Sequence, residues 1–310
     1  MRPTTPRCST VSMSLGEPLF ATASLVTNWI LLEQPGPWGY EALERSRLPT
    51  PVARDLRRRS RALGIRIVLI RRPGRSAPPR RTCFFVHTGL QAQRLECVEL
   101  ESPGDLLDLD WSPLVRGEPV AAGSPDHDPL FLVCTNGGRD RCCAERGRSV
   151  AAALEEAFGE RAWECSHIGG DRFAANVVCF PHGVYYGRVH HGEAAGLASE
   201  YRHGRLDLEH YRGRTCYDFA TQAAEAFIRR ARSLDGIDDV VLVDRTRSPG
   251  RLEARFDTPV GPAVVTIAIG RGLPRRLTCQ SATAVGPPEY ELLGIAGPGT
   301  PAVSAGGTLG

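Results

Sequence analysis

The middle third of the chain has an order of apolar runs and amphipathic stretches that permits few folds. Short apolar runs, which favour strands, come before and after a stretch whose apolar residues recur every three or four positions, as in a helix. Along the chain the predicted elements are a strand at 130–133, a helix through 150–158, a strand at 162–167, a hairpin formed by 176–180 and 184–189, and a helix at 193–201. This order predicts a central β-sheet with helices packed against it.

The other two thirds predict further α/β structure and give the chain its expected domain boundaries. The first third has strands at 28–34, 65–70, 82–86 and 95–100, and a helix at 49–63. The last third has a helix at 217–234, strands at 240–243, 252–256, 263–269 and 276–279, and an end rich in Gly and Pro. We therefore expect an N-terminal α/β domain at 1–125, a second domain at 126–212, a C-terminal helix with strands at 213–285, and a disordered tail at 286–310.

The charge and cysteine content of the 310 residues exclude several classes of protein. All 38 basic residues are arginine, so a mechanism that needs a lysine, such as a Schiff base or a P-loop, is excluded. The net charge of +3 is too small to predict binding to nucleic acid or to a membrane. Ten cysteines are too few for a disulfide scaffold of this length, and no secretory signal opens the chain. We expect a soluble protein of the reducing cytoplasm.

Four polar residues lie at the ends of two predicted strands of the middle third. Cys134 ends the first strand, and Cys143 lies where the following helix starts. His167 and Asp171 come at the end of the next strand, on either side of Ile168-Gly169-Gly170, whose glycines permit a tight turn beside a bulky cofactor. A helix start favours the thiolate form of cysteine, and thiolates are ligands of soft metal centres. Two loops that meet at one end of a sheet would bring the four side chains to a single centre.

Longer motifs surround these residues. They are Val-Cys-Thr-Asn at 133–136, Cys-Ala-Glu-Arg-Gly at 143–147, His-Ile-Gly-Gly-Asp-Arg-Phe-Ala at 167–174, Phe-Pro-His-Gly-Val-Tyr-Tyr-Gly-Arg at 180–188, Pro-Gly-Pro-Trp-Gly at 35–39 and Leu-Ile-Arg-Arg-Pro-Gly-Arg at 69–75. Together they resemble the sucrase/ferredoxin-like family, over most of residues 8–285. That family is related to the thioredoxin-like 2Fe–2S ferredoxins. The resemblance implies an α/β thioredoxin-like ferredoxin domain. The first third has a similar order of elements and predicts a second thioredoxin-like unit before it, and the last third predicts a small α+β part after it.

The resemblance also implies a ligand set. The family motif Cys-Ala-x-Arg-Gly selects Cys143, rather than Cys142, as the second ligand after Cys134. His167 and Asp171 then occupy the third and fourth positions, where ferredoxins of this kind have C-x3-C and some relatives have His-x3-His. A single 2Fe–2S cluster held by these four residues is therefore what the resemblance implies.

The fourth ligand has alternatives, because a carboxylate is a harder ligand than a thiolate or an imidazole. Cys165 lies two residues before His167, and both would project from the same face of the strand. Water, or Cys142 in exchange for Cys143, are further options. We otherwise interpret Cys142 and six other cysteines as core or surface thiols, namely Cys8, Cys83, Cys97, Cys179, Cys216 and Cys279.

The function that we expect is single-electron transfer by a 2Fe–2S carrier with a redox partner protein, and with neither nucleic acid nor membrane as a partner. The alternative is a thioredoxin-like interaction module that binds zinc, for which two Cys, one His and one Asp also suffice, or that binds no metal. An electron carrier fits better than an enzyme. Nothing in the sequence supports sucrase activity, because no pair of carboxylates is placed to act across a sugar.

Overall fold

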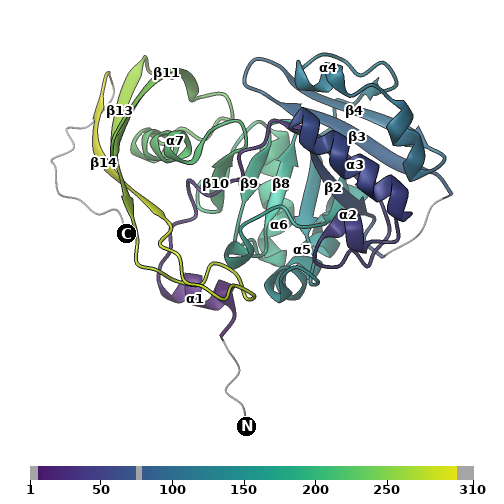
Figure 1. The fold of residues 1–310 in the computed structure, drawn as a ribbon. Helices are drawn as coiled ribbons and strands as arrows, with labels where there is room; N and C mark the ends of the chain where they lie inside the picture. The colour runs from purple at the N-terminus through teal and green to yellow at the C-terminus, as the bar shows by residue number, and fades with distance from the viewer. Residues whose placement is uncertain (1–5, 75–78, 299–310) are drawn as a thin grey trace, which may run out of the picture.

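The computed structural model describes residues 6–74 and 79–298, which form a mixed α/β fold built on two β-sheets. A large curled sheet of ten strands carries helices on its faces, and a smaller antiparallel sheet of four strands stands at the other end of the molecule (Figure 1). Helix α7 lies between the small sheet and the rest of the chain (Figure 1).

The ten-stranded sheet consists of two halves with the same strand order. From the centre outward, one half runs β2-β1-β3-β4-β5 and the other β7-β6-β8-β9-β10. In each half the first two strands are parallel and every later pair is antiparallel. The strands are β1 (Asn28–Glu33), β2 (Arg66–Arg71), β3 (Arg81–Thr88), β4 (Gln93–Leu100), β5 (Ser124–Pro125), β6 (Leu130–Cys134), β7 (Ala162–Cys165), β8 (Val177–Phe180), β9 (Val184–Tyr186) and β10 (Tyr211–Arg214).

The two halves join where β2 and β7 pair antiparallel, with Ile70 opposite Cys165. A buried ion pair crosses this joint, because Nε of Arg71 lies 2.6 Å from Oε2 of Glu164. The strands of the first and second predicted domains thus form one continuous sheet. The predicted boundary at residue 212 falls inside β10, which pairs with β9.

The helices are short, and the longest, α5, has 18 residues. They are α1 (Cys8–Ser14), α2 (Ala42–Arg45), α3 (Thr50–Leu63), α4 (Ser112–Val115), α5 (Arg141–Phe158), α6 (His191–Arg202) and α7 (Phe219–Arg232), with 3-10 turns η1 (Pro103–Asp108), η2 (Gly159–Arg161) and η3 (Asp171–Phe173). Over residues 6–74 and 79–298, none of them combines the length and the apolar character that crossing a lipid bilayer requires.

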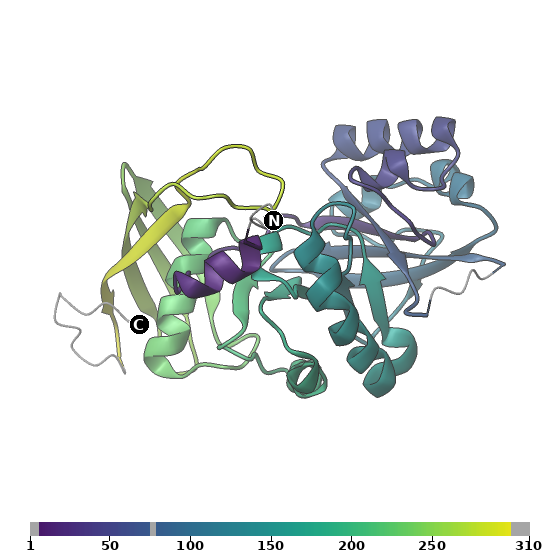
Figure 2. The ribbon, with the colours of Figure 1, turned by 90° about the horizontal axis from the view of Figure 1, so that it is seen from below.

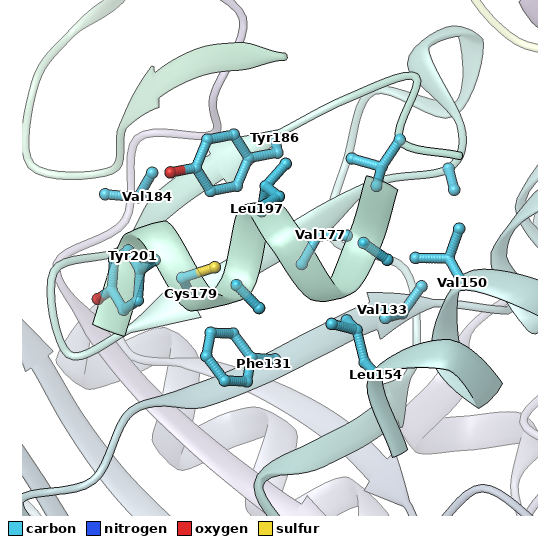
Figure 3. Packing of buried hydrophobic residues seen from close by; sticks show 14 of the residues in the cluster. Phe131, Val133, Val150, Leu154, Val177, Cys179, Val184, Tyr186, Leu197 and Tyr201 are labelled. Atoms are coloured by element: carbon cyan, nitrogen blue, oxygen red, sulfur yellow. The ribbon is translucent and has the colours of Figure 1, made fainter. Parts of the chain in front are cut away.

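The second half of the large sheet has its hydrophobic core between the sheet and helices α5 and α6. Val150 and Leu154 project from α5 toward Phe131 and Val133 of β6, as Figure 3 shows. Each such fully buried side chain contributes roughly 1.5–3 kcal/mol through removal of its surface from water. This packing holds helix α5 against β6 and therefore fixes the position of the first turn of the helix.

The C-terminal part packs α7 on the sheet formed by β11 (Val241–Ser248), β12 (Arg251–Asp257), β13 (Ala263–Arg271) and β14 (Pro288–Ala296). Strand β14 corrects the expectation of a disordered tail from residue 286. Its Tyr290, Leu292 and Ile295 pack against the buried cluster under α7, and this contact stabilises a strand despite the Gly and Pro content around it. Residues 299–310 of the predicted tail lie outside the described residues.

The connection between β13 and β14 runs past the N-terminal helix α1, and both views show the two segments close together (Figures 1 and 2). The backbone N–H of Cys8 lies 3.4 Å from Sγ of Cys279. The strand predicted at 276–279 is absent, because these residues belong to this connection and not to the four-stranded sheet. The connection and α1 instead meet at the start of α5.

Candidate functional site

The four side chains predicted to form one centre do meet, and we call them the mixed-donor site: Cys134, Cys143, His167 and Asp171. Sγ of Cys143 lies 3.2 Å from Oδ1 of Asp171, and Nδ1 of His167 lies 3.0 Å from the same oxygen. Cys134 lies close enough to Cys143 and His167 for both to shift its pKa. The four polar groups therefore lie in one neighbourhood, in which Asp171 contacts both Cys143 and His167.

The local sequence explains why α5 comes so close to the end of β6. Cys134 ends β6, and Cys143 lies in the first turn of α5. A Cβ atom on Gly147, one turn further along, would lie only 2.3 Å from the carbonyl oxygen of Cys134. Glycine at this position lets the helix backbone rest on the strand end, which brings the two cysteines together.

A buried arginine and an asparagine shape the second loop, between His167 and Asp171. Nη1 of Arg212 donates a hydrogen bond to Oδ1 of Asn176 at 2.8 Å, and Nδ2 of Asn176 donates to the carbonyl of Gly170 at 2.9 Å. Gly170 has a φ of +80°, and a Cβ there would lie 2.2 Å from Nη2 of Arg212. Only glycine fits this turn, and the turn directs His167 and Asp171 back toward the thiols.

Proximity and burial set the charges of the mixed-donor site. The pKa of Cys134 is lowered to about 5, because the interactions with Cys143 and His167 outweigh the effect of burial. The pKa of Cys143 is held well above its usual value by its interaction with Cys134 and by burial. Burial disfavours the charged form of His167, but the nearby Asp171 and Cys134 raise its pKa to about 9. The pKa of Asp171 is lowered despite burial, because His167 and Cys143 stabilise the carboxylate. Cys143 and His167 must each lose a proton before they bind a metal.

One nitrogen of the site is buried without a well-aligned partner. Nδ1 of His167 is close to the Asp171 carboxylate, yet its geometry fulfils no hydrogen bond with any described residue. The imidazole and the carboxylate attract one another at this distance. The side chain of His167 is 25% exposed, whereas that of Asp171 is 3% exposed. Of these two residues, His167 is the one that reaches the surface.

Of the two alternative ligands, Cys165 lies beside the mixed-donor site and Cys142 faces away from it. Cys165 is opposite Cys134 in the β6–β7 pair and is buried in the same cluster as Cys134 and Cys143, where burial raises its pKa well above the usual value. Cys142 precedes Cys143 in α5, and consecutive helical residues point about 100° apart. Its thiol faces α1, where hydrogen bonds from Cys8 and Ser9 lower its pKa to about 6.

Cys142 belongs to a second group that the sequence analysis missed. Cys8, Cys142, Cys279 and Asp140 place one ligand atom each within 4.8 Å of one another, and we call them the three-cysteine site. Cys8 and Cys279 are 271 residues apart, so no motif spacing links them. The only sequence signal for this group was the adjacent pair Cys142 and Cys143 in α5. Consecutive residues of a helix point in different directions, so the two thiols cannot both face one centre.

Comparison with known proteins agrees with the motifs of the mixed-donor site. The family model described as sucrase/ferredoxin-like matches residues 19–213, which is more than half of the chain and includes all four residues of that site. The chain belongs to the sucrase/ferredoxin-like family. Cys8 and Cys279 of the three-cysteine site lie outside the region matched by the family model.

Two curated relatives carry the name "Altered inheritance of mitochondria protein 32". The one from Meyerozyma guilliermondii is 29% identical over 97 residues, covering 28% of this chain and 34% of the relative. The one from Clavispora lusitaniae is 36% identical over 104 residues, covering 30% of this chain and 37% of the relative. The alignments thus span about a third of each relative's length. No solved structure matches the chain.

Proposed function

We propose that the chain is a thioredoxin-like 2Fe–2S electron carrier whose cluster is held by Cys134, Cys143, His167 and Asp171. The observation that carries this proposal is the gathering of four donor groups from two loops at one end of the sheet, where Asp171 contacts both Cys143 and His167. The strand order β7-β6-β8-β9, with a parallel first pair and antiparallel later pairs, supports the thioredoxin-like part of the proposal. Membership of the sucrase/ferredoxin-like family supports the ferredoxin part.

The donor set suits such a cluster. A cluster with two irons takes two ligands on each iron, and the site offers four donor groups: two thiols, one imidazole and one carboxylate. Nδ1 of His167 is a buried nitrogen that has no aligned partner among the described residues, as a metal-binding imidazole requires. Thiolate and imidazole are usual ligands of iron–sulfur centres, and the carboxylate of Asp171 is the unusual member.

When bound, a cluster of this kind supplies one-electron redox chemistry, with a higher potential than in an all-cysteine ferredoxin because imidazole carries less negative charge than thiolate. The chain contributes three buried donor groups and one partly exposed edge. Cys134, Cys143 and Asp171 are almost completely buried and keep water from the donors. The partly exposed side chain of His167 is where a redox partner protein would approach.

The direct test is chemical analysis of the full chain purified without oxygen. We expect a coloured protein with roughly two irons and two acid-labile sulfides per chain. Substitution Cys134→Ser should remove the colour, whereas Cys179→Ser, a buried cysteine of β8, should leave it in place. A colourless wild-type protein that takes up neither iron nor sulfide on anaerobic reconstitution would refute the proposal.

A second candidate function is a zinc-binding module at the same four residues. The observation that favours it is the closeness of the donors, at 3.0 and 3.2 Å, since ligands of one tetrahedral zinc ion lie roughly 3.3–3.6 Å apart. Elemental analysis separates the two functions. A zinc ion that is bound at this site without sulfide, and that is lost in Cys134→Ser, would favour the zinc-binding module.

The cytoplasm remains our proposal for the compartment. All ten cysteines are free, which suits a reducing environment. The relatives' name refers to mitochondrial inheritance, so cell fractionation that compares the cytosol with mitochondria is the appropriate test.

A further inference from the structure

The three-cysteine site brings together sulfur atoms from three distant segments. Cys8 lies at the start of α1, Cys142 in the first turn of α5, and Cys279 in the connection between β13 and β14. Their Sγ atoms form a nearly equilateral triangle, with separations of 3.6 Å between Cys8 and Cys142, 3.5 Å between Cys142 and Cys279, and 3.5 Å between Cys279 and Cys8.

These separations match the edges of a tetrahedron around a single metal ion. With zinc–sulfur bonds of about 2.3 Å, tetrahedral angles place neighbouring sulfur atoms about 3.8 Å apart. The corresponding distance between a sulfur and a carboxylate oxygen is about 3.6 Å, and Oδ2 of Asp140 lies 3.7 Å from Sγ of Cys8. A disulfide, with sulfurs only about 2.05 Å apart, would use two of the three thiols and leave the third without a role.

Asp140 is held rigidly at the fourth corner. It is the N-cap of α5, where its Oδ1 accepts a hydrogen bond from the backbone N–H of Cys142 at 2.9 Å. Its Oδ2 accepts another from the backbone N–H of Cys279 at 2.7 Å. The residue is 0% exposed, so its position depends on these bonds and not on solvent. Hydrogen bonds of this kind orient metal ligands.

Hydrogen-bond donors surround the sulfur atoms. The hydroxyl of Ser9 donates to Sγ of Cys142 at 3.3 Å, and Arg146 fixes that hydroxyl with a bond from its Nε at 3.1 Å. The backbone N–H of Cys8 donates to Sγ of Cys279 at 3.4 Å. The positive end of the α5 dipole and such donors stabilise thiolates, which are the form that binds metal.

We propose that Cys8, Cys142 and Cys279 bind one zinc ion, with Asp140 as the fourth ligand. Three thiolates and a carboxylate that surround the metal on all sides make a closed site of the structural kind, with no position open for substrate. The ion joins α1 and the β13–β14 connection, which both lie outside the matched family region, to the helix that carries Cys143. Its role is to hold α1 and the β13–β14 connection against the start of α5.

The test begins with the wild-type full chain, purified under reducing conditions with zinc in the growth medium. We expect about one tightly bound zinc ion per chain from this site, and X-ray absorption at the zinc edge with three sulfur neighbours and one oxygen neighbour. This measurement needs no variant, so it does not depend on whether a substituted chain folds. A zinc ion in the mixed-donor site would instead show two sulfur neighbours.

Two variants assign the site. Cys8→Ser and Cys279→Ser should each remove one zinc ion per chain and leave the iron and sulfide content unchanged, while Cys134→Ser should remove iron and leave this zinc in place. Cys97→Ser is the matched control, because Cys97 is a partly buried cysteine of β4 that belongs to neither site. It should change no metal content.

Two outcomes would overturn the proposal. One is that the reduced wild-type protein, supplied with zinc, binds no zinc ion that is lost in Cys8→Ser. The other is mass spectrometry of the native protein that finds two of the three thiols joined in a disulfide. Both results are independent of the mixed-donor site, so failure here and failure of the electron-carrier proposal are distinguishable.

Discussion

The mixed-donor site and the three-cysteine site contain consecutive residues of α5, Cys143 and Cys142, and differ in almost every other respect. Cys143 lies beside donors from the same half of the large sheet, whereas Cys142 faces Cys8 of α1 and Cys279 of the β13–β14 connection. The first site combines two thiols with an imidazole and a carboxylate and has a partly exposed edge at His167. The second has three thiols, of which those of Cys8 and Cys142 are buried, around a fully buried carboxylate.

One helix start thus presents two adjacent thiols to two different sets of donors. An exposed imidazole edge suits exchange of electrons with another protein, while a closed set of sulfur ligands suits a structural ion. Substitutions at the two sites should therefore separate iron content from the anchoring of α1 and the β13–β14 connection.

The largest effect is expected for Cys134→Ser. Loss of one thiolate from the mixed-donor site should reduce bound iron by more than roughly tenfold, because even changes outside the ligand set weaken metal sites by about that factor. Iron and visible absorption of the purified protein measure the effect, with Cys179→Ser as the control. Equal iron content in the two variants would remove Cys134 from the ligand set.

Asp171→Asn should cause the next largest loss of bound iron. An amide cannot supply the negative charge of the carboxylate, so iron retention should fall by about tenfold. Asp171→His should restore it, because an imidazole is a usual ligand of iron–sulfur centres. If Asp171→Asn keeps the wild-type spectrum, Asp171 is not a ligand, and Cys165→Ser becomes the decisive variant.

The mixed-donor site was predictable from the sequence because each of its pairs is local. Cys134 and Cys143 come at the two ends of one loop, and His167 and Asp171 at the ends of another, so strand order alone brought them together. The three-cysteine site was not predictable in this way. Cys8 and Cys142 are 134 residues apart, and only tertiary packing of α1 and the β13–β14 connection makes them neighbours.

The same contrast holds for the fold. Apolar periodicity predicted β1, α3, the β3–β4 pair and the strands from β6 to β9, which depend on local pattern. It did not predict the antiparallel β2–β7 joint, which is a contact between elements far apart in the chain. It was wrong about β14, whose apolar residues gain their stability from the cluster under α7. Composition alone cannot reveal such a contact.

A smaller loss of iron is expected for Gly170→Ala, with Gly204→Ala as a matched control. Both glycines have positive φ, +80° and +76°, and an alanine at either costs roughly 1–2 kcal/mol of backbone strain. A Cβ at Gly170 also meets Arg212, whereas a Cβ at Gly204 meets nothing within 4 Å. Only Gly170→Ala should displace the 167–171 loop and lose part of the iron. Equal iron and equal Tm in both variants would contradict the role given to that turn.

Cys8→Ser should leave iron unchanged and lower stability. Loss of a bound ion that binds only the folded chain should lower Tm by about 5 °C and expose α1 to proteases. Thermal unfolding and limited proteolysis, compared with Cys97→Ser, measure both effects. A variant with the Tm and cleavage pattern of the control would show that the three-cysteine site anchors nothing.

The decisive experiment is electron paramagnetic resonance of the reduced full chain with its histidines labelled with 15N. A cluster held by the mixed-donor site should give a spin-half signal with coupling to one histidine nitrogen, and His167→Cys should keep a signal but abolish that coupling. A signal without nitrogen coupling in the wild-type protein, or no signal in a protein that has been reconstituted with iron and sulfide and then reduced, would contradict the account.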